Sequence, residues 1–245
     1  MANPFEKQIR EAVRQFWRTK RLQSRQQGSG GGKKDQGNRS AVTGGKHLDG
    51  FAELFRQIAN RAGIDSSCVY TRKSEVVLPG FFRATKQWDL LIVHDQKLLA
   101  AIEFKSQVGS LGNNANNRAE EAVGNATDFW TAYRDNIIPM SPRPWLGFLF
   151  LLEDSDDSTK PVRILEPHFQ AHEMFQNTSY MERYVLCCKQ MIRERLYDAA
   201  ALIASDSVNG PKGTYREPDQ QVGIEMLITA ISAHLRSNAE YSHSE

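Results

Sequence analysis

Apolar residues recur along the chain with two different spacings, which together predict a mixture of helices and strands. Spacings of three and four residues predict amphipathic helices, and continuous or alternating apolar runs predict strands. The predicted helices begin near Phe5, Asp49, Ala119, Ser179 and Gln220, and the last four end near Gly63, Ile137, Ala204 and Arg236. The predicted strands are 68–78, 88–94, 98–105, 145–152 and 162–165. The expected fold class is therefore α/β.

The middle of this order is a helix, three strands, a second helix and a fourth strand. The run 145–152 is apolar apart from one glycine, which is typical of a central strand covered on both faces. We expect one domain over 1–245, with this core at 47–152. A helix and a glycine-rich loop are expected at 1–46, and a mainly helical part at 153–245.

Composition limits the class of protein. Of the 245 residues, 40% are apolar, which is enough to bury a core. The longest apolar run is far shorter than the roughly 20 residues of a membrane span. The first residues lack the apolar segment of a secretory signal, so a cytoplasmic protein without a membrane partner is expected. Cys68 and the adjacent Cys187 and Cys188 are expected to be reduced thiols.

Charge is unevenly distributed along the chain. Residues 1–46 hold 11 Lys and Arg against 3 acidic residues, and the remainder holds 20 against 26. On the first helix, the bases occupy the face opposite the apolar stripe, and we name them the basic ridge: Lys7, Arg10, Arg14, Arg18, Arg21 and Arg25. The ridge is either a solvated outer face or a surface that meets phosphates. The second interpretation predicts contacts from Arg10, Arg14 and Arg18 to the phosphates of a polyanion.

The strands 88–94 and 98–105 are predicted to form a hairpin closed by Asp95-Gln96-Lys97. If that three-residue loop makes the turn, Asp89 lies opposite Glu103. Alternation along the second strand places Glu103 and Lys105 on one face. The register is an assumption of this prediction.

Two carboxylates about 5 Å apart on a sheet repel each other, and a divalent cation removes that repulsion. Oxygen ligands of this kind suit Mg²⁺, and a neighbouring lysine can orient a water or stabilise charge growing on phosphorus. The chemistry indicated is metal-assisted phosphodiester hydrolysis. The pattern alone is weak, because ordinary charges at strand ends would produce it too.

The order of elements and the three residues Asp89, Glu103 and Lys105 resemble the core of the PD-(D/E)xK nuclease superfamily. Four longer runs resemble the XhoI type of type II restriction endonucleases, and they cover most of the chain. They are AVTGGKHLDGF at 41–51, LPGFFRATKQWDLLIVH at 78–94, IEFKSQVGSLGNNANNRAEEAVGNATDFWTAYR at 102–134 and SPRPWLGFLFLLED at 141–154. The resemblance leaves open whether the chain is the founding enzyme of that family or a near relative.

The resemblance implies a Mg²⁺-dependent homodimer that cuts both strands of double-stranded DNA at CTCGAG and leaves 5′-phosphates. A separate DNA methyltransferase acting on the same site is expected with it. Asp89 and Glu103 are the implied metal ligands, with the Phe104 carbonyl as a further ligand and Lys105 as the water-orienting base or an electrostatic group. Trp88 stands where the motif has proline, which is not a ligand. Glu53 is either a further acid of the site or a surface residue.

Further residues are candidates for DNA contacts. Gln107 continues the face of Glu103 and Lys105. The amides and the guanidinium at 113–118 match the donors and acceptors of adenine and guanine, although asparagines also cap helices and form turns. The candidates are Asn113, Asn114, Asn116, Asn117, Arg118, Gln107, Lys46, His47, Arg83 and Lys86.

Two other functions use the same fold. One is a repair or recombination nuclease with little sequence preference, which would digest a plasmid to a smear and not to discrete bands. The other is a DNA-binding module that has lost catalysis, which is disfavoured because Asp89, Glu103 and Lys105 are all present.

Overall fold

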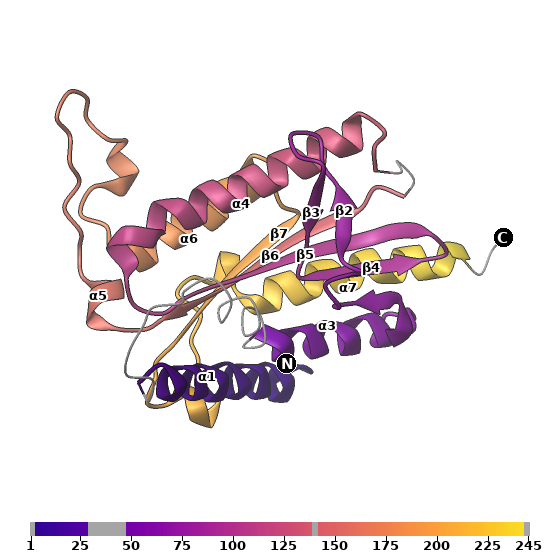
Figure 1. Cartoon of the computed structure of the whole chain (residues 1–245), viewed down its shortest axis with the longest axis horizontal. Coiled ribbons are helices and arrows are strands. Elements are labelled where there is room, and N and C mark those ends of the chain that lie inside the picture. Colours follow the sequence, from indigo (N-terminus) through magenta and orange to yellow (C-terminus); the bar gives the residue numbers. More distant parts are fainter. Residues whose placement is uncertain (1–2, 29–47, 139–141, 243–245) are drawn as a thin grey trace.

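A five-stranded mixed sheet lies between two layers of helices in the computed structural model, which describes residues 3–28, 48–138 and 142–242 (Figure 1). The strand order is β1-β4-β5-β6-β7. Strands β1, β4 and β5 are antiparallel, whereas β5, β6 and β7 are parallel. Their bounds are β1 Val69–Tyr70, β4 Leu90–His94, β5 Lys97–Gln107, β6 Trp145–Glu153 and β7 Ala199–Ser205. The predicted α/β class is confirmed.

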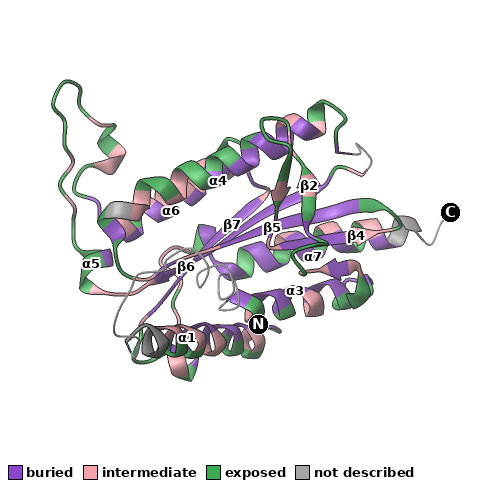
Figure 2. Ribbon diagram, in the orientation of Figure 1, coloured by how far each residue is buried: buried purple, intermediate pink, exposed green. Residues whose placement is uncertain are grey.

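Alternate strand residues build two hydrophobic cores, one on each face of the sheet. Ile102 and Phe104 of β5 face the layer of α1, α3 and α7, and Ala101 faces the layer of α4 and α6. Figure 2 shows buried positions on the inner sides of both layers. The helices are α1 Glu6–Gly28, α3 Asp49–Arg61, α4 Leu111–Arg134, α5 Asp156–Thr159, α6 Tyr180–Arg193 and α7 Ile224–Ser242. Short 3₁₀ turns are η2 Ser66–Cys68, η3 Glu173–Phe175, η4 Gly210–Lys212 and η5 Gln220–Val222.

The hairpin of β4 and β5 has the register that the sequence predicts, but reaches it differently. The loop has two residues, Asp95 and Gln96, both with positive φ (48° and 59°), so the predicted three-residue loop is wrong. A β-bulge between Ile92 and Val93 shifts the register by one residue, and Leu90 then pairs with Ile102. Asp89, which directly precedes the strand, therefore comes opposite Glu103.

The predicted strand 68–78 is two separate strands. β1 ends at Tyr70, and a turn rich in polar residues leads away from the main sheet. Residues Val77–Pro79 (β2) and Thr85–Gln87 (β3) then pair with each other as a separate antiparallel hairpin. Charged side chains at 72, 73 and 75 cannot continue into the buried sheet without unpaired charge, which explains the break.

Two C-terminal predictions are wrong. The segment 162–165 forms no strand. The helix predicted at 179–204 ends at Arg193, and Arg195, with φ of 57°, turns the chain into β7. The alanine-rich β7 has high helix propensity, but every residue in it is buried, so packing against β6 and both helical layers overrides that propensity. The C-terminal part thus supplies an edge strand of the sheet.

No helix in the described parts of the chain is long and apolar enough to cross a membrane. Cys68, Cys187 and Cys188 are free thiols, as predicted. Burial raises the pKa of Cys187 to about 11, so this thiol is neutral at physiological pH.

Candidate active site

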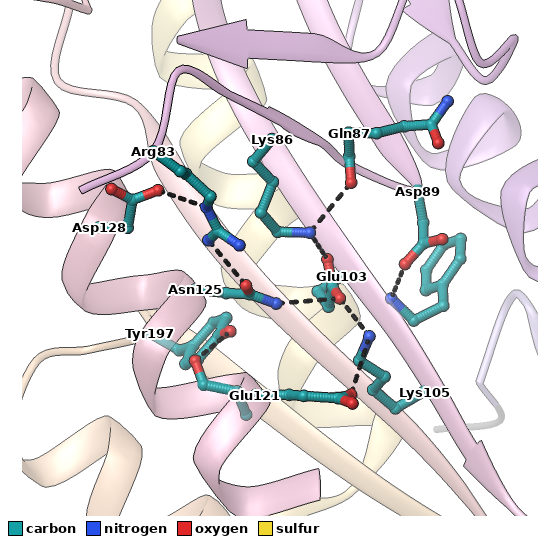
Figure 3. Close-up of polar contacts among 12 residues, drawn as sticks. Arg83, Lys86, Gln87, Asp89, Glu103, Lys105, Glu121, Asn125, Asp128 and Tyr197 are labelled. Carbon is teal, nitrogen blue, oxygen red and sulfur yellow. Dashed lines mark hydrogen bonds and ion pairs between the residues drawn. The ribbon is translucent and has the colours of Figure 1, made fainter. Parts of the chain in front are cut away.

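Asp89, Glu103 and Lys105 meet on the face of the sheet covered by α4 (Figure 3). Oδ2 of Asp89 accepts a hydrogen bond of 2.7 Å from the backbone N–H of Phe104. Because the N–H and C=O of one strand residue point to the same side, the Phe104 carbonyl is also directed toward Asp89, beyond the end of β4. Burying the Phe104 ring between Phe51 and Phe55 of α3 fixes this part of β5.

Glu103 is 2% exposed, and its two oxygens are held by three side chains. Its Oε1 lies 2.5 Å from Nζ of Lys105 and accepts a 3.2 Å bond from the Asn125 amide. Its Oε2 accepts a 2.8 Å bond from Nζ of Lys86. The two ammonium groups offset the repulsion between the carboxylates, a counter-charge that the sequence argument omitted.

The surroundings of the cluster raise the pKa of two of its side chains, Asp89 and Lys105. Burial, followed by the charge of Glu103, raises the pKa of Asp89 to about 6, and the Phe104 N–H opposes this shift. Burial favours neutral Lys105, but the carboxylates of Glu103, Asp89 and Glu121 outweigh it and raise the pKa of Lys105. The Lys105 ammonium therefore stays paired with the Glu103 carboxylate.

The donor set fits a hard divalent cation. Asp89 and Glu103 offer carboxylate oxygens, and Phe104 offers a carbonyl oxygen in the same place, a combination that Mg²⁺ completes with waters and phosphate oxygens. The structure does not bring Glu53 to this cluster: its side chain is exposed, contacts Arg56 and accepts a bond from Gln57. Within the described residues, no group of three or more His, Cys, Asp or Glu side chains could hold a metal.

The β2–β3 hairpin and α4 support the cluster through a chain of hydrogen bonds. Oδ2 of Asp128 accepts a 2.7 Å bond from Arg83, Arg83 donates a 2.8 Å bond to Asn125, and Asn125 donates to Glu103. Asn125 and Asp128 are 8% and 4% exposed and were missed from sequence. Glu121, Asn125 and Asp128 are spaced four and three residues apart and so lie on one face of α4. This spacing is the sequence pattern from which Asn125 and Asp128 could have been predicted.

Arg83 and Lys86, predicted to contact phosphates, therefore lie within this network. Arg83 pairs with Asp128. Lys86 is held between Glu103 and the ring of Trp88, 4.5 Å from the ring centroid.

The candidates at 113–118 lie in the first two turns of α4. Asn114 donates a 3.0 Å bond to the carbonyl of Ser110, one helical turn earlier. Asn116 and Asn117 are exposed, and Asn113 is in the helix. Arg118 forms a 2.9 Å ion pair with Glu121, which also lies 3.5 Å from Lys105, and this connects Arg118 to the cluster.

The remaining candidates for DNA contacts are Gln107, Lys46 and His47. Gln107 is 5% exposed and donates to the carbonyl of Gly109, so the structure buries it beside the site and does not present it to solvent. Lys46 and His47 lie outside the described residues.

The basic ridge of α1 is partly used inside the molecule. Arg14 donates a 3.1 Å bond to the carbonyl of Lys212, and Arg21 a 2.7 Å bond to that of Ser207. Arg10 pairs with Glu6 at 2.6 Å within α1 and donates a 3.5 Å bond to the carbonyl of Gly213. Arg18 is exposed. Three ridge arginines therefore hold α1 and neighbouring parts of the chain together, as expected for a docked helix.

Replacing Arg14 and Arg21 together by glutamine is expected to lower the melting temperature by a few degrees, because two bonds to carbonyls are lost. Arg18→Gln is the matched control. It should leave melting unchanged and, if Arg18 meets a phosphate, flatten the log–log salt dependence of DNA binding by about 1. If the double variant instead melts at the wild-type temperature and flattens the salt dependence by about 2, Arg14 and Arg21 contact DNA phosphates.

Known proteins similar in sequence to this chain are type II restriction enzymes. BstVI of Geobacillus stearothermophilus is 46% identical over 212 residues, covering 84% of this chain and 94% of BstVI. AbrI of Azospirillum brasilense is 45% identical, covering 68% of this chain and 74% of AbrI. XhoI of Xanthomonas vasicola is 40% identical, covering 77% of this chain and 75% of that enzyme. No solved structure matches the chain.

These similarities define the class of the protein: it is a site-specific type II restriction endonuclease with double-stranded DNA as its substrate. Enzymes of this class generally need a divalent metal. A model of the family described as Restriction endonuclease XhoI matches residues 25–217, and the chain belongs to that family. At 40% identity it is a relative of the Xanthomonas vasicola enzyme and a different protein.

Proposed function

We propose that the chain hydrolyses one phosphodiester bond in each strand of CTCGAG, with Mg²⁺, and leaves 5′-phosphates. Asp89, Glu103 and Lys105 carry the reaction. The observation that supports this most directly is their meeting on one face of β4 and β5, where Glu103 is buried yet held by charged groups. The layout α3, β1, β4, β5, α4, β6 supports a PD-(D/E)xK core, within one nuclease domain over 1–245.

Each residue has a distinct task in this proposal. The carboxylates of Asp89 and Glu103 and the Phe104 carbonyl hold the cation. When bound, Mg²⁺ supplies an acidified water and a counter-charge for the phosphate. Lys105, a cation beside Glu103, orients the attacking water and stabilises the negative charge that develops on the phosphate oxygens. Asn125 and Lys86 position Glu103 and keep its carboxylate from turning away.

The recognition sequence follows from the resemblance of the long runs to the XhoI type, and is supported by 40% identity to an enzyme of that name. A palindrome has two equivalent halves, so a two-fold symmetric homodimer would read both with the same contacts and cut both strands. A methyltransferase acting on the same site would protect the host DNA. It acts on DNA independently and is not a bound subunit.

Removal of divalent metal by a chelator is expected to abolish cleavage, and Mg²⁺ to restore it fully. Ca²⁺ should permit cognate binding without rapid cutting, because the larger ion accepts these ligands with looser geometry. Single-turnover cleavage and equilibrium binding in each metal measure this. Full cleavage in the presence of the chelator would show that the reaction needs no divalent metal. Sedimentation of the DNA complex with one protein copy would contradict the proposed homodimer.

Arg118→Ala is expected to weaken cognate binding by roughly 1–3 kcal/mol and to affect random DNA much less, if its guanidinium reads a guanine. Free energies of binding to both DNAs at equal salt measure this. The ion pair with Glu121 offers a control: Glu121→Gln frees Arg118 without removing it and should preserve the preference for the cognate site. Equal losses on both DNAs in Arg118→Ala would make it a phosphate contact.

A further inference from the structure

The tip of the β2–β3 hairpin exposes two neighbouring aromatic rings, and we name Phe81 and Phe82 the aromatic tip. Phe81 is 47% and Phe82 69% exposed. Their ring centroids lie 5.0 Å apart with the planes at 75°, an edge-to-face pair. The two adjacent rings form an exposed apolar surface that contact with another molecule would remove from water.

The backbone beneath these rings is fixed. The N–H groups of Phe81 and Phe82 both donate 2.8 Å bonds to Oδ1 of Asp128 on α4. Gly80 lets the chain pass so close that a Cβ there would lie 2.6 Å from the carbonyl oxygen of Arg83. The rings therefore project from a rigid turn, and little ordering is needed when they bind a partner.

The same hairpin is connected to the candidate active site. Asp128, which holds the tip, lies one helical turn from Asn125, which donates to Glu103. At the base of the hairpin, Lys86 contacts Glu103 directly. Figure 3 shows Arg83 and Lys86 reaching from this hairpin toward α4 and β5. A DNA duplex whose scissile phosphate is bound beside Glu103 would therefore also lie close to the aromatic tip.

We propose that the aromatic tip is an apolar wedge that inserts against a base step of the DNA duplex near the scissile phosphate and unstacks it. Phenylalanine wedges open base steps in this way, and the unstacking is offset by contact between ring and base. The partner is the DNA substrate and not a second protein copy, because the tip is continuous with the network that holds Glu103. The location of the cut rests on the proposed function.

The test uses the full-length enzyme in Ca²⁺ and a duplex containing the sequence that the enzyme itself cuts. One adenine in or beside that sequence is replaced by 2-aminopurine, whose fluorescence rises when it unstacks. Wild-type enzyme is expected to raise the fluorescence at one position. Phe82→Ala should lose most of that rise and bind the duplex roughly tenfold or more weakly. Phe82→Tyr keeps the aromatic ring and Phe82→Leu keeps an apolar side chain of the kind that acts as a wedge, so both variants should retain more of the fluorescence rise and of the binding than Phe82→Ala.

Phe169→Ala is the matched control, since Phe169 is 89% exposed in a segment far from Glu103 along the chain, and should behave as wild type. Normal binding and fluorescence of Phe82→Ala would overturn the wedge, and so would weaker binding with an unchanged fluorescence rise. Conversion of a wild-type dimer to a monomer by Phe82→Ala would make the tip a subunit contact and also overturn it. Lys105→Ala separates the two proposals: normal cutting by Lys105→Ala refutes the catalytic assignment and leaves the test of the tip intact.

Discussion

Alanine in place of Asp89, Glu103 or Lys105 is expected to lower the single-turnover rate of DNA cleavage by at least about a thousandfold. In the proposed mechanism the three side chains act as a unit: Asp89 and Glu103 would hold the cation, and Lys105 contacts the same Glu103 oxygen that Asn125 holds. A double variant should therefore be little slower than either single variant. Asp89→Ala and Glu103→Ala should still bind cognate DNA, because replacing a carboxylate removes negative charge facing the phosphates.

Glu53→Ala is the control for this set. Its carboxylate is exposed on α3 and contacts Arg56 and Gln57, so cleavage should stay within about threefold of wild type. If Glu53→Ala cleaves DNA as slowly as Glu103→Ala, Glu53 takes part in the active site after all. A Lys105→Ala enzyme with near-normal turnover would remove Lys105 from the mechanism.

Asp128→Ala is expected to destabilise the protein by about 2–3 kcal/mol and lower its melting temperature by roughly 5–10 °C. The carboxylate accepts bonds from two backbone amides and from Arg83, and all three lose their partner together. Cleavage should slow by roughly tenfold, because Arg83 no longer holds Asn125 against Glu103. Thermal unfolding and single-turnover kinetics measure the two effects.

The contribution of the Asp128 carboxylate to the stability of the fold should depend on pH. Burial favours its neutral form, but the amides of Phe82 and Phe81 and the Arg83 guanidinium outweigh burial and hold the pKa of Asp128 below its ordinary value. The charged form therefore stabilises the fold above about pH 4, and this contribution is lost as the pH falls through the lowered pKa. The difference in melting temperature between wild type and Asp128→Ala should be constant near neutrality and shrink in acid. Asp128→Asn can still accept the amide bonds and should lie between the two.

Much of the fold was predictable because local patterns there agree with tertiary packing. The apolar stripe of α3 and the continuous run of β6 both follow from periodicity. The bulge between Ile92 and Val93 was not predictable, because neither residue carries a turn signal. The prediction of the register succeeded only because the shorter loop and the bulge compensate each other. Strand β7 was missed because its helix-forming alanines are buried by partners distant in the sequence.

The candidate site also contains residues that the sequence predicted and residues that it did not. Asp89, Glu103 and Lys105 were found because they lie on one hairpin, where alternation fixes the faces. Asn125 and Asp128 lie on α4, and their role depends on a hairpin that crosses to them from residues 79–87. A polar residue in a helical pattern does not reveal which distant segment will pack on it, so the supporting network and the anchoring of the aromatic tip required the structure.

The most direct measurement is digestion of a DNA of known sequence by the purified enzyme in Mg²⁺, with both cut ends mapped to the nucleotide. We expect discrete fragments that end within CTCGAG on both strands and carry 5′-phosphates, and no fragments from a parallel digest with Lys105→Ala. Cleavage at a different sequence would contradict the proposed specificity. A smear from wild-type enzyme, or uncut DNA that contains CTCGAG, would contradict the account as a whole.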